Sequence, residues 1–238
     1  DDALLNGGLT EDTEINIENG VYYERVVIIN YGTQSNSDYL TNGYRLDVRG
    51  LGNNVFIDGG DTANNCLRIS NMVNVHFDRV NLRNTEPDGY DPDFGTYGNS
   101  AHLYITGNNT SEDPLEMSNF SFTNASIRNG YVGCRIINNV KDILFENVII
   151  SSCEYGGYRL GSPDPLDKLF NVTIRKCTFS TSATSPNEEG TSHILMKEAN
   201  NFIIEDCTFF NATRNAISVN SSDSTFIRRN TFFGGGSG

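Results

Sequence analysis

The sequence predicts an all-β solenoid, a single coil of parallel strands, and three observations support this prediction. One line, written "IRKCTF" at 174–179 and "IEDCTF" at 204–209, recurs with copies that begin at residues 77, 122, 145, 174, 204 and 227. A short alternation of apolar and polar residues precedes each copy, as in "HILMK" (193–197). No segment of helical length repeats its apolar residues with a 3.6-residue period.

Each repeat therefore contains a strand, a turn, a second strand, another turn and a short strand. Such a unit has one apolar face and cannot bury it alone, but units stacked at about 4.8 Å bury a continuous core. Stacking aligns like residues in ladders, and we interpret Cys177 and Cys207 as small buried side chains rather than metal or redox groups. One inward ladder contains Phe77, Phe122, Phe145, Ile174, Ile204 and Ile227, and a second contains Val80, Ala125, Val148, Cys177, Cys207 and Asn230.

Composition narrows the class of partner. The chain has 17 basic and 30 acidic residues and a net charge of −13. Nucleic-acid binding depends mainly on Lys and Arg that neutralise phosphates, so this balance argues against DNA or RNA. Solubility alone explains such acidity, and calcium sites or an extracellular, salty habitat explain it equally well. No apolar run approaches the roughly 20 residues of a membrane helix, and five cysteines, an odd number, do not make a disulfide framework.

The two ends of the sequence predict the domain boundaries. The opening "DDALLNGG" (1–8) reads as a mature or excised start without a signal peptide, and sequons such as "NAT" (211–213) permit a secretory origin and a glycoprotein. The closing "GGGSG" (234–238) is typical of a flexible linker. We therefore expect one domain over residues 1–233, followed by a linker-like tail.

Two segments near the start of the chain complete a resemblance to a known family. The segment "EINIENGVYYERVVIIN" (14–30) is similar to the entry of right-handed parallel β-helix, or pectin-lyase-like, proteins. The segment "RGLGNNVFIDGG" (49–60) resembles the Gly-rich turn before their first regular coil. The resemblance covers nearly the whole chain and implies a single-stranded right-handed parallel β-helix of roughly eight coils. Its motifs mark the fold, which many unrelated functions share.

In this superfamily, enzymes generally bind polysaccharide along the sheet made by the first strand of each coil, between flanking loops. On that sheet we expect Arg135 and Arg159 to point outward on adjacent coils, where their like charges favour an anion such as a uronate or sulfate group. Alternatively, Glu154 or a loop acid neutralises them, or they extend into water. The expected outward residues are Arg68, Tyr104, Arg135, Arg159, Leu195 and Ser218 in the middle column and His102, His193 and Lys197 in the flanking columns.

An acidic and aromatic loop, "TEPDGYDPDFGTYGNS" (85–100), is expected to overhang this sheet. Its carboxylates are the hard oxygen ligands that Ca²⁺ prefers, although their spacing matches no EF-hand and a solvated loop is the alternative. Its aromatic rings offer a flat surface on which sugars stack. The candidate residues are Asp88, Asp91 and Asp93 for calcium and Tyr90, Phe94 and Tyr97 for sugar stacking.

Two chemistries suit a cationic sheet on this fold. Cleavage of a uronate polymer by β-elimination needs a base for the proton α to the carboxylate and cations that neutralise the carboxylate. Hydrolysis needs clustered carboxylates, which the outward columns lack. Lyases of the superfamily use Lys or Arg bases, often with calcium. The resemblance therefore implies catalytic roles for Lys197, His193 and Arg159, with Lys197 favoured as the base and Arg135 beside Arg159 as the carboxylate clamp.

A function of a different class is a non-catalytic structural or adhesive module. A β-helix ends in rims of unpaired strands that favour association, and "DDALLNGGLTED" (1–12) is too short and Gly-broken for a plug. This predicts end-to-end or lateral self-association, in a filament or a trimeric spike on a cell or virion surface, or a module of a longer chain. Under either function we expect an extracellular or surface protein, and the favoured partner is an acidic polysaccharide.

Overall fold

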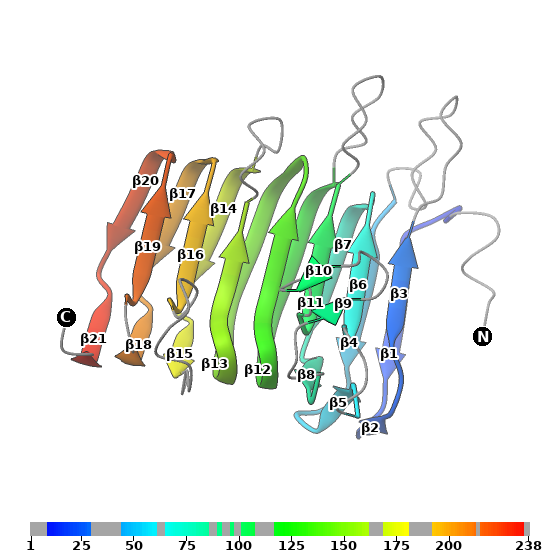
Figure 1. Cartoon of the computed structure of the whole chain (residues 1–238). Helices are drawn as coiled ribbons and strands as arrows, with labels where there is room; N and C mark the ends of the chain where they lie inside the picture. Colours follow the sequence, from blue (N-terminus) through cyan, green and yellow to red (C-terminus); the bar gives the residue numbers. More distant parts are fainter. Residues whose placement is uncertain are drawn as a thin grey trace.

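The computed structural model describes residues 9–29, 44–60, 65–85, 90–91, 96–97, 101–107, 117–161, 169–180, 192–212 and 215–235. In these residues the chain forms strands β1 to β21 and no helix, and so it has no helical segment there that is able to cross a membrane. The strands wind around one axis, from β1 at the blue end to β21 at the red end (Figure 1). A continuous network of parallel pairs joins all of them except β9 (Tyr90–Asp91) and β10 (Thr96–Tyr97), which form an antiparallel pair.

Three sheets of parallel strands form the walls of the coil, and we name them A, B and C. In each sheet a strand pairs with the equivalent strand of the next coil, and the long strands β12 and β13 run through all three sheets. Sheet A faces the viewer in Figure 1. It contains β3 (Val26–Ile29), β6 (Leu67–Ser70), β11 (Leu103–Thr106), the ends of β12 (Met117–Ile137) and β13 (Val140–Leu160), β16 (Ile194–Lys197) and β19 (Ile217–Asn220).

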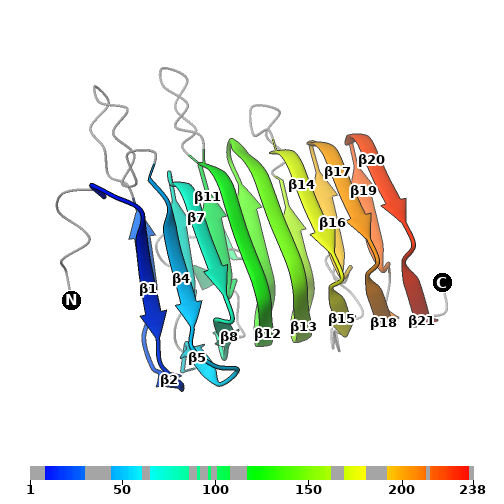
Figure 2. The same ribbon diagram turned by 180° about the vertical axis from the view of Figure 1, so that it is seen from behind.

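Sheet B lies on the opposite side, which Figure 2 presents. It has a strand in each of eight successive coils of the described chain, which confirms the expected right-handed parallel β-helix of roughly eight coils. It contains β1 (Thr13–Ile17), β4 (Leu46–Gly50), β7 (Val73–Asp78), the starts of β12 and β13, β14 (Leu169–Arg175), β17 (Ala199–Glu205) and β20 (Asp223–Arg228).

Sheet C closes the coil between sheets B and A. Apart from β12 and β13, its strands have three to five residues each. Each follows the sheet B strand of the same coil. It contains β2 (Gly20–Tyr22), β5 (Val55–Asp58), β8 (Asn81–Arg83), the middles of β12 and β13, β15 (Thr178–Ser180), β18 (Thr208–Ala212) and β21 (Thr231–Gly235).

The ladder predicted from the repeated line is present residue for residue. Phe77, Phe122 and Phe145 are partners on successive coils of sheet B, and the ladder continues through Ile174, Ile204 and Ile227. Its members are buried up to Ile204, whereas Ile227 in the last described coil is 46% exposed. The interior is therefore a stack of like side chains, each covered by the coil on either side.

Buried cysteines are part of this stack. Cys177 and Cys207 are each 1% exposed, and all five cysteines are buried free thiols. Burial raises the pKa of the Cys66 and Cys153 thiols to about 12, so both stay protonated. The interpretation of Cys177 and Cys207 as small core side chains is confirmed.

One left-handed residue forms the corner between sheets B and C in six of the described coils. Two of the six are asparagine, which tolerates this conformation better than most residues with a Cβ, because its short polar side chain hydrogen-bonds locally. The corner side chains also bond along the axis: Asn147 donates to Asn124 at 2.8 Å, and Asn124 donates to Asp78 at 2.7 Å. With φ between 52° and 58°, the corner residues are Arg79, Asn124, Asn147, Lys176, Asp206 and Arg229.

Candidate functional site

The predicted middle column of sheet A is assembled by strand register. Arg68 and Tyr104 are partners, as are Tyr104 and Arg135, and Arg135 and Arg159. The column continues to Leu195 and Ser218. Strand partners on adjacent coils lie about 5 Å apart at their backbones, so these side chains form one row along the axis.

The three arginines of this row, Arg68, Arg135 and Arg159, are half-buried. Their Nε atoms are shielded from solvent, which means that each side chain packs against its neighbours along most of its length. In the described segments that pair in sheet A (26–29, 67–70, 103–106, 134–137, 158–160, 194–197 and 217–220), no residue is Asp or Glu. The strands of sheet A thus carry cations in a chain whose net charge is −13.

Tyr104 lies in the row but is not an open surface for a sugar. Its side chain is 1% exposed, and the guanidinium carbon of Arg68 lies 5.6 Å from its ring centroid. A ring that is already covered cannot stack on a polymer. The prediction that Tyr104 contacts substrate is wrong in this respect, and the register alone did not show what covers it.

The prediction that His102 and His193 point outward beside this row is wrong. Both imidazoles are fully buried. His102 contacts the carbonyl oxygens of Val132 at 3.1 Å and Asn129 at 3.2 Å, and His193 donates to the carbonyl oxygen of Phe210 at 3.0 Å. Each histidine precedes its strand at a corner of the coil, where the alternation of inward and outward side chains does not hold.

A glycine in the next coil provides the space that the His102 imidazole occupies. A Cβ added to Gly130 would collide with this ring. Burial lowers the pKa of His102 to about 4 and lowers that of His193 as well. Both are therefore neutral structural groups at neutral pH, and neither can reach a substrate on sheet A.

Lys197 remains as a candidate base. It is the last residue of β16, half-buried, with Asn220 as its strand partner. Leu195, two residues earlier on the same face, is the partner of Arg159, so Lys197 lies diagonally from Arg159 on this face. Arg159 and Lys197 are thus near neighbours on adjacent strands of sheet A.

The loop candidates are only partly within the described residues. Tyr90 and Tyr97 are strand partners in the β9–β10 pair, which includes Asp91, but their side chains lie outside the description. Asp88 and Asp93 also lie outside the described residues, as does the side chain of Glu154. Within the described part of the chain no three His, Cys, Asp or Glu residues gather as metal ligands. The calcium site stays a prediction, as does self-association.

Comparison with known proteins agrees with this architecture. A family model described as "Right handed beta helix region" matches residues 103–238, which is more than half of the chain. The chain belongs to this family. Comparison with curated protein sequences found no match.

Solved structures with a similar course of the chain include enzymes and an adhesin. A pectin methylesterase in complex with a hexasaccharide is 13% identical, with 92% of this chain and 75% of that one covered and a TM-score of 0.40. The surface adhesin PfbA of Streptococcus pneumoniae is 13% identical, with 97% and 74% covered and a TM-score of 0.39. A pectin methylesterase from Yersinia enterocolitica is 8% identical, with 94% and 90% covered and a TM-score of 0.41. Such weak likenesses carry no argument about function.

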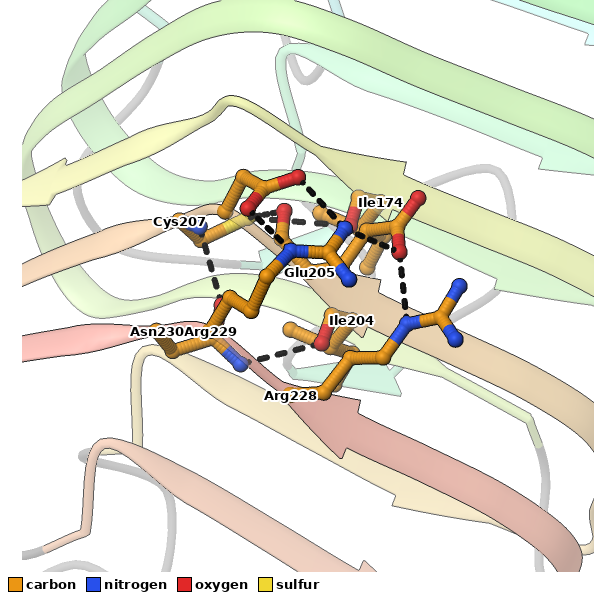
Figure 3. A network of polar contacts seen from close by, with 8 residues as sticks. Ile174, Ile204, Glu205, Cys207, Arg228, Arg229 and Asn230 are labelled. Atoms are coloured by element: carbon orange, nitrogen blue, oxygen red, sulfur yellow. Dashed lines mark hydrogen bonds and ion pairs between the residues drawn. The ribbon is translucent and has the colours of Figure 1, made fainter.

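The outward charged residues of sheet B are arranged differently from those of sheet A. Its outward column alternates in sign: Arg175 donates to Glu146 at 2.8 Å, and Arg228 donates to Glu205 at 2.8 Å. Figure 3 shows Arg228 and Arg229 directed at Glu205. Hydrogen bonds from Arg175 and Lys176 lower the pKa of Glu146. The full column is Asn16, Arg49, Asp78, Thr123, Glu146, Arg175, Glu205 and Arg228.

Sequence reasoning assigned no role to the third histidine, His76, which lies outward on sheet B and contacts Ser121 of the next coil at 2.8 Å. The sequence did contain a pattern that predicts this contact. The stretch "NVHFD" (74–78) alternates around Phe77, and the repeated line pairs it with "NFSFT" (119–123). Register alone therefore brings His76 beside Ser121.

Proposed function

We propose that this β-helix protein binds an acidic polysaccharide along sheet A. The observation that carries the proposal is the in-register row of Arg68, Arg135 and Arg159 on the outward face of sheet A. A polymer with a carboxylate or sulfate on each unit supplies anions to such a row.

The physical basis is charge-assisted hydrogen bonding. Like charges on adjacent strands destabilise a sheet by themselves, and a carboxylate between Arg135 and Arg159 converts this repulsion into two attractive contacts. Guanidinium groups suit this role because their planar N–H donors match a carboxylate, and such bonds contribute about 1.5–3 kcal/mol each. Screening by salt weakens the attraction between exposed charges, so the affinity should fall as ionic strength rises.

We further propose that the bound polymer is cleaved by β-elimination. The amine of Lys197 takes the proton α to the uronate carboxylate, and the electrons of this C–H bond form a double bond in the ring. The bond to the oxygen of the 4-linked sugar breaks, and this oxygen takes a proton from water as the sugar leaves. Arg135 and Arg159 neutralise the carboxylate and so favour loss of the α proton. The diagonal placement of Lys197 and Arg159 on one face supports this assignment. Polymers of this class are extracellular, which is the location we propose for the protein.

The test combines binding with product formation. The protein is titrated by calorimetry with alginate, pectate and chondroitin sulfate, each with calcium and with chelator, while ultraviolet absorbance follows the unsaturated product. We expect Arg135→Ala with Arg159→Ala to weaken binding about a hundredfold, as two charge-assisted contacts are lost. Arg175→Ala, on sheet B, is the matched control and should leave affinity unchanged.

Polymer binding and polymer cleavage are distinguished by different results of this experiment. Equal affinity of the double variant and the parent protein for every polymer would overturn binding on sheet A. Binding with no rise in absorbance would remove the elimination step and leave a binding module. If absorbance rises, Lys197→Ala should bind normally and lose turnover; an unchanged rate in this variant would exclude Lys197 as the base.

A further inference from the structure

A second site lies on the outward face of sheet B. A cavity of about 200 Å³ opens there, over strands β4, β7 and β12. It is distant in the fold from the arginine row, because sheets A and B are different walls of the coil (Figures 1 and 2). Its lining includes Arg45, Asp47, Arg49, His76, Asp78 and Ser121.

Three residues in this cavity form a row across adjacent coils. Asp47 is the strand partner of His76, and His76 is the strand partner of Ser121. The Nδ1 atom of His76 lies 2.8 Å from the Oγ atom of Ser121. With the ring proton on Nε2, the hydroxyl of Ser121 donates to Nδ1, which is the arrangement of a serine next to its base.

The charged groups around His76 keep its ring able to accept a proton. Burial and the positive charge of Arg45 lower the pKa of His76, and Asp47 acts in the opposite direction. Arg49 and Asp78 are the other charged side chains that line the cavity. Because the ring is half-buried and its pKa lies below its usual value, His76 is neutral at neutral pH.

The cavity also contains donors for a developing negative charge. Arg45 donates from Nε to Asp47 at 2.8 Å, and Arg49 contacts Glu14 at 3.3 Å and Asp78 at 4.0 Å. A guanidinium has five N–H donors, so these contacts use only part of what the two arginines offer. Donors of this kind stabilise the oxyanion of an acyl-transfer reaction.

We propose that Ser121 and His76 are the nucleophile and base of a second active site that hydrolyses esters of small carboxylic acids, of the acetyl class. The volume of about 200 Å³ admits a short acyl group and is below the 300–1,000 Å³ of pockets for larger ligands. The alcohol part of the ester lies outside the cavity, where a sugar hydroxyl is compatible with the exposed surface of sheet B. This activity does not rest on polysaccharide binding by sheet A.

The reaction is balanced with water as the only co-reactant. Ser121 Oγ bonds to the ester carbonyl carbon while its proton passes to His76 Nδ1. The C–O bond to the alcohol then breaks, and the alcohol leaves with the proton from His76. Water attacks the acyl-serine and gives one proton to His76; the serine ester bond breaks, His76 returns this proton to Ser121 Oγ, and the carboxylic acid is released.

The experiment measures acyl transfer directly on the full chain. The protein is incubated with p-nitrophenyl acetate at neutral pH, release of nitrophenolate is recorded, and mass spectrometry of peptides locates any acetyl group. In parallel, a fluorophosphonate probe labels reactive serines. We expect an acetyl group and the probe on Ser121, and a loss of about a hundredfold in rate for Ser121→Ala and for His76→Asn.

The matched control is Ser118→Ala. Ser118 is on the same strand, half-buried like Ser121, but does not line the cavity, and its variant should keep the parent rate and labelling. Thermal melts of all variants check that each is folded. Labelling at other residues only, or rates in Ser121→Ala and His76→Asn equal to the parent rate, would overturn the proposal and leave the pair as a surface hydrogen bond.

Discussion

On sheet B, Arg175 lies between Glu146 and Glu205, whereas on sheet A, Arg135 lies between Tyr104 and Arg159. The same repeat thus builds one outward column that balances its charges internally and another whose charged residues are all arginines. In a solenoid the inward ladder holds the coils together, so outward positions are free to differ between sheets. The comparison indicates that sheet B is stabilised by ion pairs between its own strands, and the proposed polymer binding is confined to sheet A.

The largest expected effect concerns acid, which should act through His102 and through Glu146 in different pH windows. His102, at the corner of sheet A, has its pKa lowered to about 4, but in the unfolded chain it titrates near 6.5. The unfolded state therefore binds more protons between these values, and His102 alone lowers the free energy of unfolding by about 3 kcal/mol as pH falls from about 7 to about 4. His193 and His76 shift in the same direction.

Denaturant unfolding at a series of pH values checks this window. His102→Gln should flatten the profile between about pH 6.5 and pH 4. Glu146 on sheet B has a lowered pKa, so its contribution is present above its ordinary value of 4.5 and is lost only below it; Glu146→Gln should change the profile only there. A parent profile that is flat from pH 7 to pH 4.5 would contradict the assignment of His102.

A smaller effect is expected when one charge of the sheet B column is reversed. Arg175→Glu removes the pair with Glu146 and places three carboxylates in succession, so that unfolding should become easier by about 1 kcal/mol, allowing for screening by solvent. The matched change on sheet A, Arg135→Glu, places a carboxylate beside Arg159 and should cost less stability while it weakens polymer binding. Urea titrations measure both variants. Equal losses of stability would remove the distinction between the two columns.

The smallest change in stability should come from placing a cation at the neutral position of the sheet B column. Thr123 is the one neutral residue between Asp78 and Glu146. Thr123→Lys supplies a cation between two carboxylates and should raise the free energy of unfolding by a few tenths of a kcal/mol at low salt. The gain should disappear at about 1 M salt, where screening is nearly complete. Thr123→Gln is the neutral control, and a loss of stability in Thr123→Lys relative to it would argue against charge alternation as a source of stability.

Register was the feature that sequence reasoning predicted most reliably. The partners Phe77, Phe122 and Phe145 and the row from Arg68 to Arg159 follow from the repeated line and period-2 alternation alone. Alternation failed at the corners, because one left-handed or turning residue changes the direction of the next side chain. His102 and His193 lie there, and both are buried.

The sequence by itself determined the coil, its register and the residues that share each outward column, because one short apolar ladder repeats and each repeat must cover its neighbour. Only the tertiary structure decided which of these residues are accessible. Tyr104 is buried although it lies in the outward row, His102 occupies the space left by Gly130, and Asp47, His76 and Ser121 line a cavity. Burial depends on how side chains from several coils and turns pack together in three dimensions, and no local pattern of the chain specifies that packing.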